Sequence, residues 1–170
     1  MVLESRAHAE RRGARIRGRF LGAAARCEPA SRRGGLTGHS LRLAIRAACR
    51  AAGLERGDVG HVNAHGVGTI DMDRVEAGAI AAELGDVPVT APKSLFGHLG
   101  AGGGVVELMA SLLGLEHGLV PGTINHDDPD PACPVNVVRG TPLGGRPATA
   151  VAVNVCSTGQ AVAVAVAGPG

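Results

Sequence analysis

Two of the seven histidines stand in glycine-flanked turns where a side chain could do chemistry. His65 follows an apolar stretch in Asn63-Ala-His-Gly-Val-Gly-Thr69, and His98 lies in Pro92-Lys-Ser-Leu-Phe-Gly-His98. An imidazole can donate a hydrogen bond or move a proton near neutral pH, and neighbouring glycines allow positive φ and close approach of a ligand. Taken alone, each histidine is a weak signal, and a surface residue or a core residue whose hydrogen bonds are satisfied is the favoured interpretation.

Glu107 supports the interpretation that the loop of His98 is part of a chemical site. It is the only charged residue between Gly100 and Leu115, in an otherwise apolar stretch. A carboxylate that is buried there requires a partner, and Lys93 is the nearest cation along the chain. We therefore expect a Lys93–Glu107 pair that fixes the loop of His98. The alternative is a helix edge at which Glu107 reaches water.

The elements that must position these residues alternate between strand and helix. Strands are predicted at 16–27, 59–65, 87–91, 149–155 and 160–167, and helices at 5–12, 38–52, 71–84 and 105–116. The rest is predicted as a strand end at 1–4, loops at 28–35 and 93–104, and a loop-rich stretch at 121–145 with a short strand at 135–138. This order predicts one α/β domain over residues 1–170, with a mixed sheet flanked by helices. Loops at strand ends would bring His65 and His98 together.

Two helix faces carry specific expectations. Thr37 is predicted to cap the helix at 38–52, whose arginine row at 42, 46 and 50 is expected to be a solvated face rather than a partner site. The helix at 105–116 has one apolar face. That face contains Val105, Leu108, Met109, Leu112 and Leu113.

Composition excludes several classes of protein. The net charge of +2 is too balanced for a general nucleic-acid binder, and 1% aromatic residues provide no stacking platform for single strands. The longest apolar run, 161–167, is too short to span a bilayer. The four cysteines form no CxxC pair, so neither a metal site nor a redox motif is expected. Without an export signal at the start, a cytoplasmic location is expected.

Several separate motifs, in the right order, resemble the C-terminal half of the β-ketoacyl-ACP synthases, the condensing enzymes of fatty-acid and polyketide synthesis. They are Asn63-Ala-His-Gly-x-x-Thr69, Pro92-Lys-Ser-x-x-Gly-His98, Glu107, Pro121-x-Thr-Ile-Asn125, and Asp73 and Glu76 after His65. The resemblance implies a thiolase-like half domain, one half of a five-layered αβαβα fold. The N-terminal half, which carries the nucleophilic Cys in the family, appears absent from the sequence, and the resemblance assigns none of the four cysteines that role.

The resemblance also implies roles for individual residues. His65 and His98 would donate to the enolate oxygen formed when malonyl-ACP loses CO₂, in the manner of an oxyanion hole. Lys93, paired with Glu107, would support His98, while Asp73 and Glu76 would be supporting residues. Thr69, Asn154 and Thr158 would lie along the substrate path. No cofactor is implied, because the substrates ride on the phosphopantetheine arm of acyl carrier protein.

Two departures from the family pattern leave alternatives open. Val67 replaces a threonine of the pantetheine channel, and Thr158 stands where the family has a gating phenylalanine, with Gly159 the only loop glycine retained. The leading hypothesis is an acyltransferase half that works with an N-terminal ketosynthase half or subunit, as a homo- or heterodimer. The alternatives are a non-catalytic ketosynthase-like partner subunit, or a truncated fragment that is inactive alone.

Overall fold

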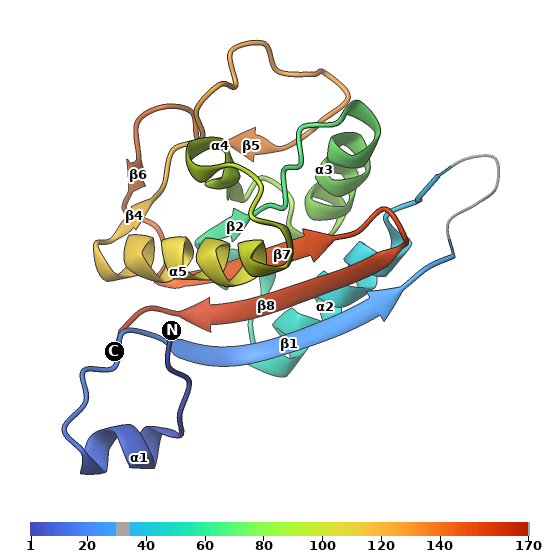
Figure 1. The fold of residues 1–170 in the computed structure, drawn as a ribbon. Coiled ribbons are helices and arrows are strands. Elements are labelled where there is room, and N and C mark those ends of the chain that lie inside the picture. The colour runs from blue at the N-terminus through green and yellow to red at the C-terminus, as the bar shows by residue number, and fades with distance from the viewer. Residues whose placement is uncertain (30–34, 170) are drawn as a thin grey trace.

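The computed structural model describes residues 1–29 and 35–169, and its centre is a six-stranded mixed sheet (Figure 1). The strand order is β1-β8-β7-β2-β3-β5, in which β1, β8 and β7 pair antiparallel and β7, β2, β3 and β5 pair parallel. Their bounds are β1 Arg19–Cys27, β2 His61–Asn63, β3 Pro88–Thr90, β5 Asn136–Val137, β7 Thr149–Val155 and β8 Gln160–Ala167. A second small sheet pairs β4 (Leu119–Val120) with β6 (Leu143–Gly144).

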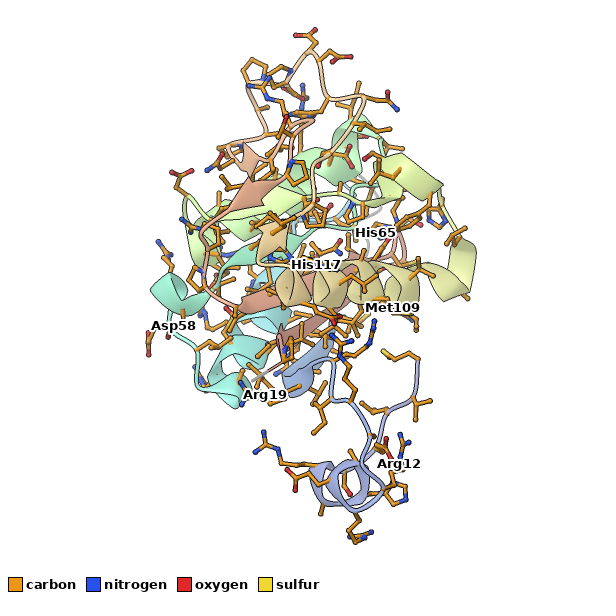
Figure 2. All side chains as sticks on the ribbon, turned by 90° about the vertical axis from the view of Figure 1, so that its left-hand side faces the viewer. Arg12, Arg19, Asp58, His65, Met109 and His117 are labelled. Atoms are coloured by element: carbon orange, nitrogen blue, oxygen red, sulfur yellow. The ribbon has the colours of Figure 1, made fainter. Side chains whose placement is uncertain are left out.

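Helices cover both faces of the main sheet. The helices of the described residues are α1 (Arg6–Arg11), α2 (His39–Ala52), α3 (Ile70–Leu84), α4 (Lys93–Phe96) and α5 (Gly103–Glu116), with 3-10 turns η1 (Arg56–Asp58) and η2 (Gly100–Gly102). Helices α2 and α5 lie on either side of β7 and β8, while α1, which is followed by Arg12, lies apart from the sheet (Figures 1 and 2). Among the described residues, no helix is both long enough and apolar enough to cross a membrane.

The β7–β8 hairpin shows how the sequence builds the two layers. Successive side chains in a strand point to opposite faces, so Val151 and Val153 join Leu41 and Ile45 of α2 in the larger core cluster. Ala150 of β7 faces the other way, in a smaller cluster beneath α5. Both arms have the bounds expected from the sequence, and the predicted mixed α/β sheet flanked by helices is confirmed.

Helix α5 presents its polar side to the sheet. Glu107 and Ser111 are 1% and 0% exposed, whereas Val105, Met109 and Leu113 of the expected apolar face are 48%, 39% and 44% exposed. Leu108 and Leu112 pack against the smaller cluster. The apolar residues therefore split between the sheet and an outer stripe, Val105–Met109–Leu113, on the surface of the chain.

Several local expectations need correction. Gly38, not Thr37, is the N-cap residue of helix α2. The helix is capped by the carboxylate of Glu28. This carboxylate accepts hydrogen bonds from the Thr37 hydroxyl and from the backbone N–H groups of Thr37, Gly38 and His39. The stretch at 93–104 folds into α4 and η2 rather than an irregular loop. Within the described ranges, residues 1–4 form no strand. Most of the loop predicted at 28–35 lies outside those ranges.

The arginine row of α2 is exposed, as predicted, but two of its members are ion-paired. Arg42 and Arg46 both bond Glu83 of α3, with N–O distances of 3.0 and 2.9 Å. Exposed pairs of this kind contribute little individually. They tie α2 to α3 on the face of the sheet opposite α5.

The Glu28 cap predicts a measurable loss of stability. Glu28→Ala leaves the α2 N-terminus without its acceptor, and we expect the free energy of unfolding to fall by about 1–3 kcal/mol. Urea denaturation of the 170-residue chain measures this. Glu10→Ala, at an exposed position of α1, is the matched control; equal stability of the two variants would contradict the capping role.

Candidate active site

His65 lies just beyond the end of β2, in a turn that is hydrogen-bonded by Glu76 of α3. The two oxygens of the Glu76 carboxylate accept the backbone N–H groups of His65 at 2.6 Å and of Gly66 at 2.8 Å. Gly66 has φ +49°, and a Cβ there would lie 2.8 Å from the side chain of Ala91. The glycine is therefore required by both backbone conformation and space, and the turn sets the position of the His65 ring.

His98 follows the short helix α4 in a second turn. Gly97 has φ +78°, which reverses the chain after α4. The Nδ1 atom of His98 accepts the backbone N–H of Gly100 at 3.0 Å. A neutral ring that accepts at Nδ1 carries its proton at Nε2. The exposed His98 ring can thus donate a hydrogen bond from Nε2.

The structure brings the two histidines together, although 33 positions separate them in the sequence. Their ring centroids are 5.8 Å apart and the ring planes are nearly perpendicular, at 86°. Two rings at this separation can aim N–H groups at one atom between them, because N–H···O distances of about 3 Å from each ring are then geometrically possible. The arrangement meets the requirement for two donors on a common oxygen.

Lys93, Glu107 and Asn154 form a buried cluster beside the histidines. Lys93 and Glu107 are 7% and 1% exposed and form an ion pair, as expected from the sequence. The second carboxylate oxygen of Glu107 accepts the side-chain amide of Asn154, at the end of β7, at 2.9 Å. A buried carboxylate with both oxygens bonded meets the requirement for compensation. The cluster joins α4, α5 and β7 at one point.

The electrostatic surroundings favour a neutral His65. Burial lowers the pKa of His65, and the positive charge of Lys93 lowers it further, against an opposing effect of Glu107. A neutral imidazole still offers one N–H donor. Burial raises the pKa of Asp73, whose carboxylate accepts the backbone N–H of Gly68 at 3.2 Å. Asp73 thereby shapes the 66–69 turn rather than facing the two rings as an acid.

A cavity of about 560 Å³ opens beside His98. It runs between α3, the 66–70 turn and the 123–137 segment, and Thr69, Lys93 and His98 are among its lining residues. Two hydroxyl contacts not expected from the sequence close its wall. The Thr123 hydroxyl accepts the Ala91 N–H at 3.0 Å, and the Ser94 hydroxyl accepts the Ile124 N–H at 3.1 Å. Only the short Pro121–Asn125 motif pointed to this segment.

Asn154 and Thr158, predicted along the substrate path, differ in where they lie. Asn154 turns its amide to Glu107, on the α5 face of the sheet. Thr158 lies in the exposed β7–β8 turn, where its hydroxyl donates to Cys156 Sγ at 3.2 Å. Within residues 1–29 and 35–169, no three His, Cys, Asp or Glu side chains gather as a metal site would require.

Glu76 predicts a pH dependence of stability. Burial raises its pKa from 4.5 to about 7, against the hydrogen bonds from Gly66 and His65. Between these values the folded chain holds a proton that the unfolded chain lacks, so the free energy of unfolding falls as pH rises. Glu76→Gln removes this titration. In urea denaturation at about pH 5 and about pH 7.5, wild type should lose more stability than Glu76→Gln. Identical losses in the two proteins would show that Glu76 does not titrate in this range.

Comparison with known proteins identifies the family. The family model of the β-ketoacyl synthase C-terminal domain matches residues 18–127. The tetracenomycin polyketide synthase ketoacyl synthase alpha subunit of Streptomyces glaucescens is 38% identical over 158 residues, which are 89% of this chain and 37% of that protein. The chain thus spans little more than a third of the length of such relatives.

Solved structures give the same answer. The ishigamide ketosynthase/chain length factor superposes with a TM-score of 0.91 at 31% identity, over 98% of this chain and 42% of that one. A type II polyketide synthase acyl-carrier protein in complex with its ketosynthase, bound to the hexaketide, gives a TM-score of 0.87 at 27% identity, over 97% and 42%. The fold is thiolase-like, as predicted. The chain belongs to the β-ketoacyl synthase family, as a C-terminal ketosynthase domain.

Proposed function

We propose that this chain supplies the two-histidine half of a decarboxylative condensing site in polyketide synthesis. The observation that carries the proposal is the 5.8 Å separation of the His65 and His98 rings beside a cavity, with the Lys93–Glu107 pair behind them. The polyketide assignment is supported by the names of the relatives, among them the tetracenomycin alpha subunit.

The chemistry requires an anion to be stabilised between the rings. When malonyl thioester loses CO₂, the electron pair of the broken C–C bond moves into the thioester carbonyl and forms an enolate oxygen. The Nε2–H of His98 and an N–H of His65 then donate to that oxygen. The enolate carbon attacks an acyl thioester, a C–C bond forms and a thiolate leaves. The chain's residues hold the oxygen, and the attacked thioester is carried on a cysteine outside these 170 residues.

A nucleophile outside the chain is consistent with the positions of its own cysteines. Cys49 is buried in α2, Cys27 is exposed at the end of β1, Cys133 lies in the 123–137 segment and Cys156 in the β7–β8 turn. None lies in the family's nucleophile motif. The partners of the proposed site are therefore a cysteine-bearing ketosynthase half and acyl carrier protein, the latter seen with a ketosynthase in a related complex.

A second function is favoured by two departures. Val67 lines the cavity where the family has a threonine, and Thr158 replaces the gating phenylalanine. A non-catalytic partner subunit could tolerate both, and a related structure is a ketosynthase/chain length factor. Retention of His65, Lys93 and His98 favours the catalytic role.

The donors should be measurable in a reconstituted enzyme. We expect His65→Ala or His98→Ala, in the chain joined to a cysteine-bearing N-terminal ketosynthase half, to slow malonyl decarboxylation by about 10²–10³-fold. Lys93→Ala should slow decarboxylation about as much as His98→Ala does. The rate loss of the double histidine variant should be smaller than the product of the two single histidine losses, because both donors share one oxygen. His117→Ala, at the exposed end of α5, is the control. Near-wild-type rates for His98→Ala would refute the assignment and favour the partner subunit.

The outer stripe of α5 should be the contact with that ketosynthase half. Val105, Met109 and Leu113 recur at four-residue spacing and are exposed; Met109 is labelled on α5 in Figure 2. Burying such a stripe is favourable. Met109→Glu should abolish co-purification with the N-terminal half, measured by size-exclusion chromatography with light scattering, whereas Arg50→Glu on α2 should not. Unchanged binding of Met109→Glu would place the interface elsewhere.

A further inference from the structure

Strand β2 and helix α5 meet through polar side chains that have no part in the proposed chemistry. His61 and Asn63 alternate along β2 and face α5, and both are essentially unexposed, at 0% and 1%. Ser111 lies one helical turn after Glu107 and is 0% exposed. An apolar contact would bury the same area with no need for partners, so this polar contact requires a specific explanation.

The Asn63 amide makes two hydrogen bonds to α5. Its Nδ2 lies 2.7 Å from the main-chain oxygen of Glu107 and 2.9 Å from the hydroxyl of Ser111, so that both amide hydrogens have acceptors. Ser111 then has its own proton free for His61 Nε2, at 3.4 Å. Burial lowers the pKa of His61 to about 4. The ring is therefore neutral at physiological pH and can accept that proton.

These bonds fix where α5 sits along its own axis. Besides the bonds of the Glu107 carboxylate to Lys93 and Asn154, the helix packs inward through apolar contacts such as Leu115 with Ala150 and Val166, and apolar packing is non-directional. A slip of one residue along a helix is about 1.5 Å. Such a slip would stretch the 2.9 Å bond from Asn154 to Glu107 beyond hydrogen-bond range. Asn63 holds the backbone of Glu107 itself, from a strand position two residues before His65.

We propose that Asn63 and Ser111 are positioning residues, which lock α5 on β2 so that the Glu107 carboxylate meets both Lys93 and Asn154 beside His65. Neither residue hydrogen-bonds the His65 or the His98 ring among the described residues, and both act through Glu107. The inference concerns the site of the proposed function. The experiment below measures the positioning role without catalytic turnover, so the positioning role and the proposed function can fail independently of each other.

The test is the titration of His65 in the 170-residue chain, followed by NMR with ¹³C-labelled histidine and assigned with His65→Gln and His98→Gln. Lys93, Glu107, His98 and Asp73 are charged or titratable groups that interact with His65, and Glu76, whose pKa is raised to about 7, accepts the His65 backbone N–H. If Asn63→Ala or Ser111→Ala lets Glu107 withdraw, its opposition to Lys93 weakens, and the His65 midpoint should move to lower pH. The Asn154 side-chain amide should also exchange with solvent faster.

Two controls separate positioning from general destabilisation. Thr90→Val alters the buried residue paired with Asn63 on β3, whose hydroxyl has no hydrogen-bond partner in the structure. Val62→Ala weakens the opposite face of β2, in the α2 core. We expect neither control to move the His65 midpoint, although Val62→Ala should lower stability.

A double-mutant cycle with Glu107→Gln tests whether Asn63 acts on His65 through the Glu107 carboxylate. In a Glu107→Gln background the carboxylate charge is already gone, so Asn63→Ala should no longer shift His65. If Asn63→Ala does not fold, Ser111→Ala, which removes a single oxygen, carries the test. An unchanged His65 midpoint and Asn154 exchange rate in Ser111→Ala would overturn the proposal. So would shifts of equal size in Val62→Ala.

Discussion

The buried carboxylate of Glu107 is the interaction on which the site depends. A charge at 1% exposure inside an apolar helix would be strongly destabilising alone. It is tolerated because Lys93 pairs with one oxygen, Asn154 bonds the other, and Asn63 bonds the main chain of the same residue. The carboxylate partners come from α4 and β7 and the main-chain partner from β2, so the bonds made to this one residue align three elements with α5. The loop of His98 begins where Lys93 is held.

The same constraint explains the orientation of α5. With Glu107 and Ser111 turned to the sheet, the helix must place some of its apolar residues on the other side, and Val105, Met109 and Leu113 become the outer stripe. This outer stripe is the surface proposed above to contact a cysteine-bearing ketosynthase half. Helix α5 therefore contributes to the site from one face and to the proposed interface from the opposite face.

Much of the fold was predictable because its strongest signals are local. The alternating Val/Ala pattern sets the bounds of β7 and β8, and the lone charge of Glu107 indicated its burial and its partner. The short helix α4 and the Glu28 cap of α2 were missed. The first is stabilised by the fold around Lys93, and the second joins Glu28 to backbone groups 9 to 11 positions later in the sequence. The roles of Asn63 and Ser111 depend on the contact between β2 and α5, which the sequence pattern alone does not contain.

The central claim is that His65 and His98 bind one oxygen together. A crystal structure of the chain in complex with a cysteine-bearing ketosynthase half and a non-cleavable malonyl thioester analogue tests it most directly. The account predicts a nitrogen of each ring within about 3.2 Å of the same thioester oxygen, with the Lys93–Glu107 pair intact. A thioester oxygen bound only by backbone N–H groups, with either imidazole turned away, would contradict it.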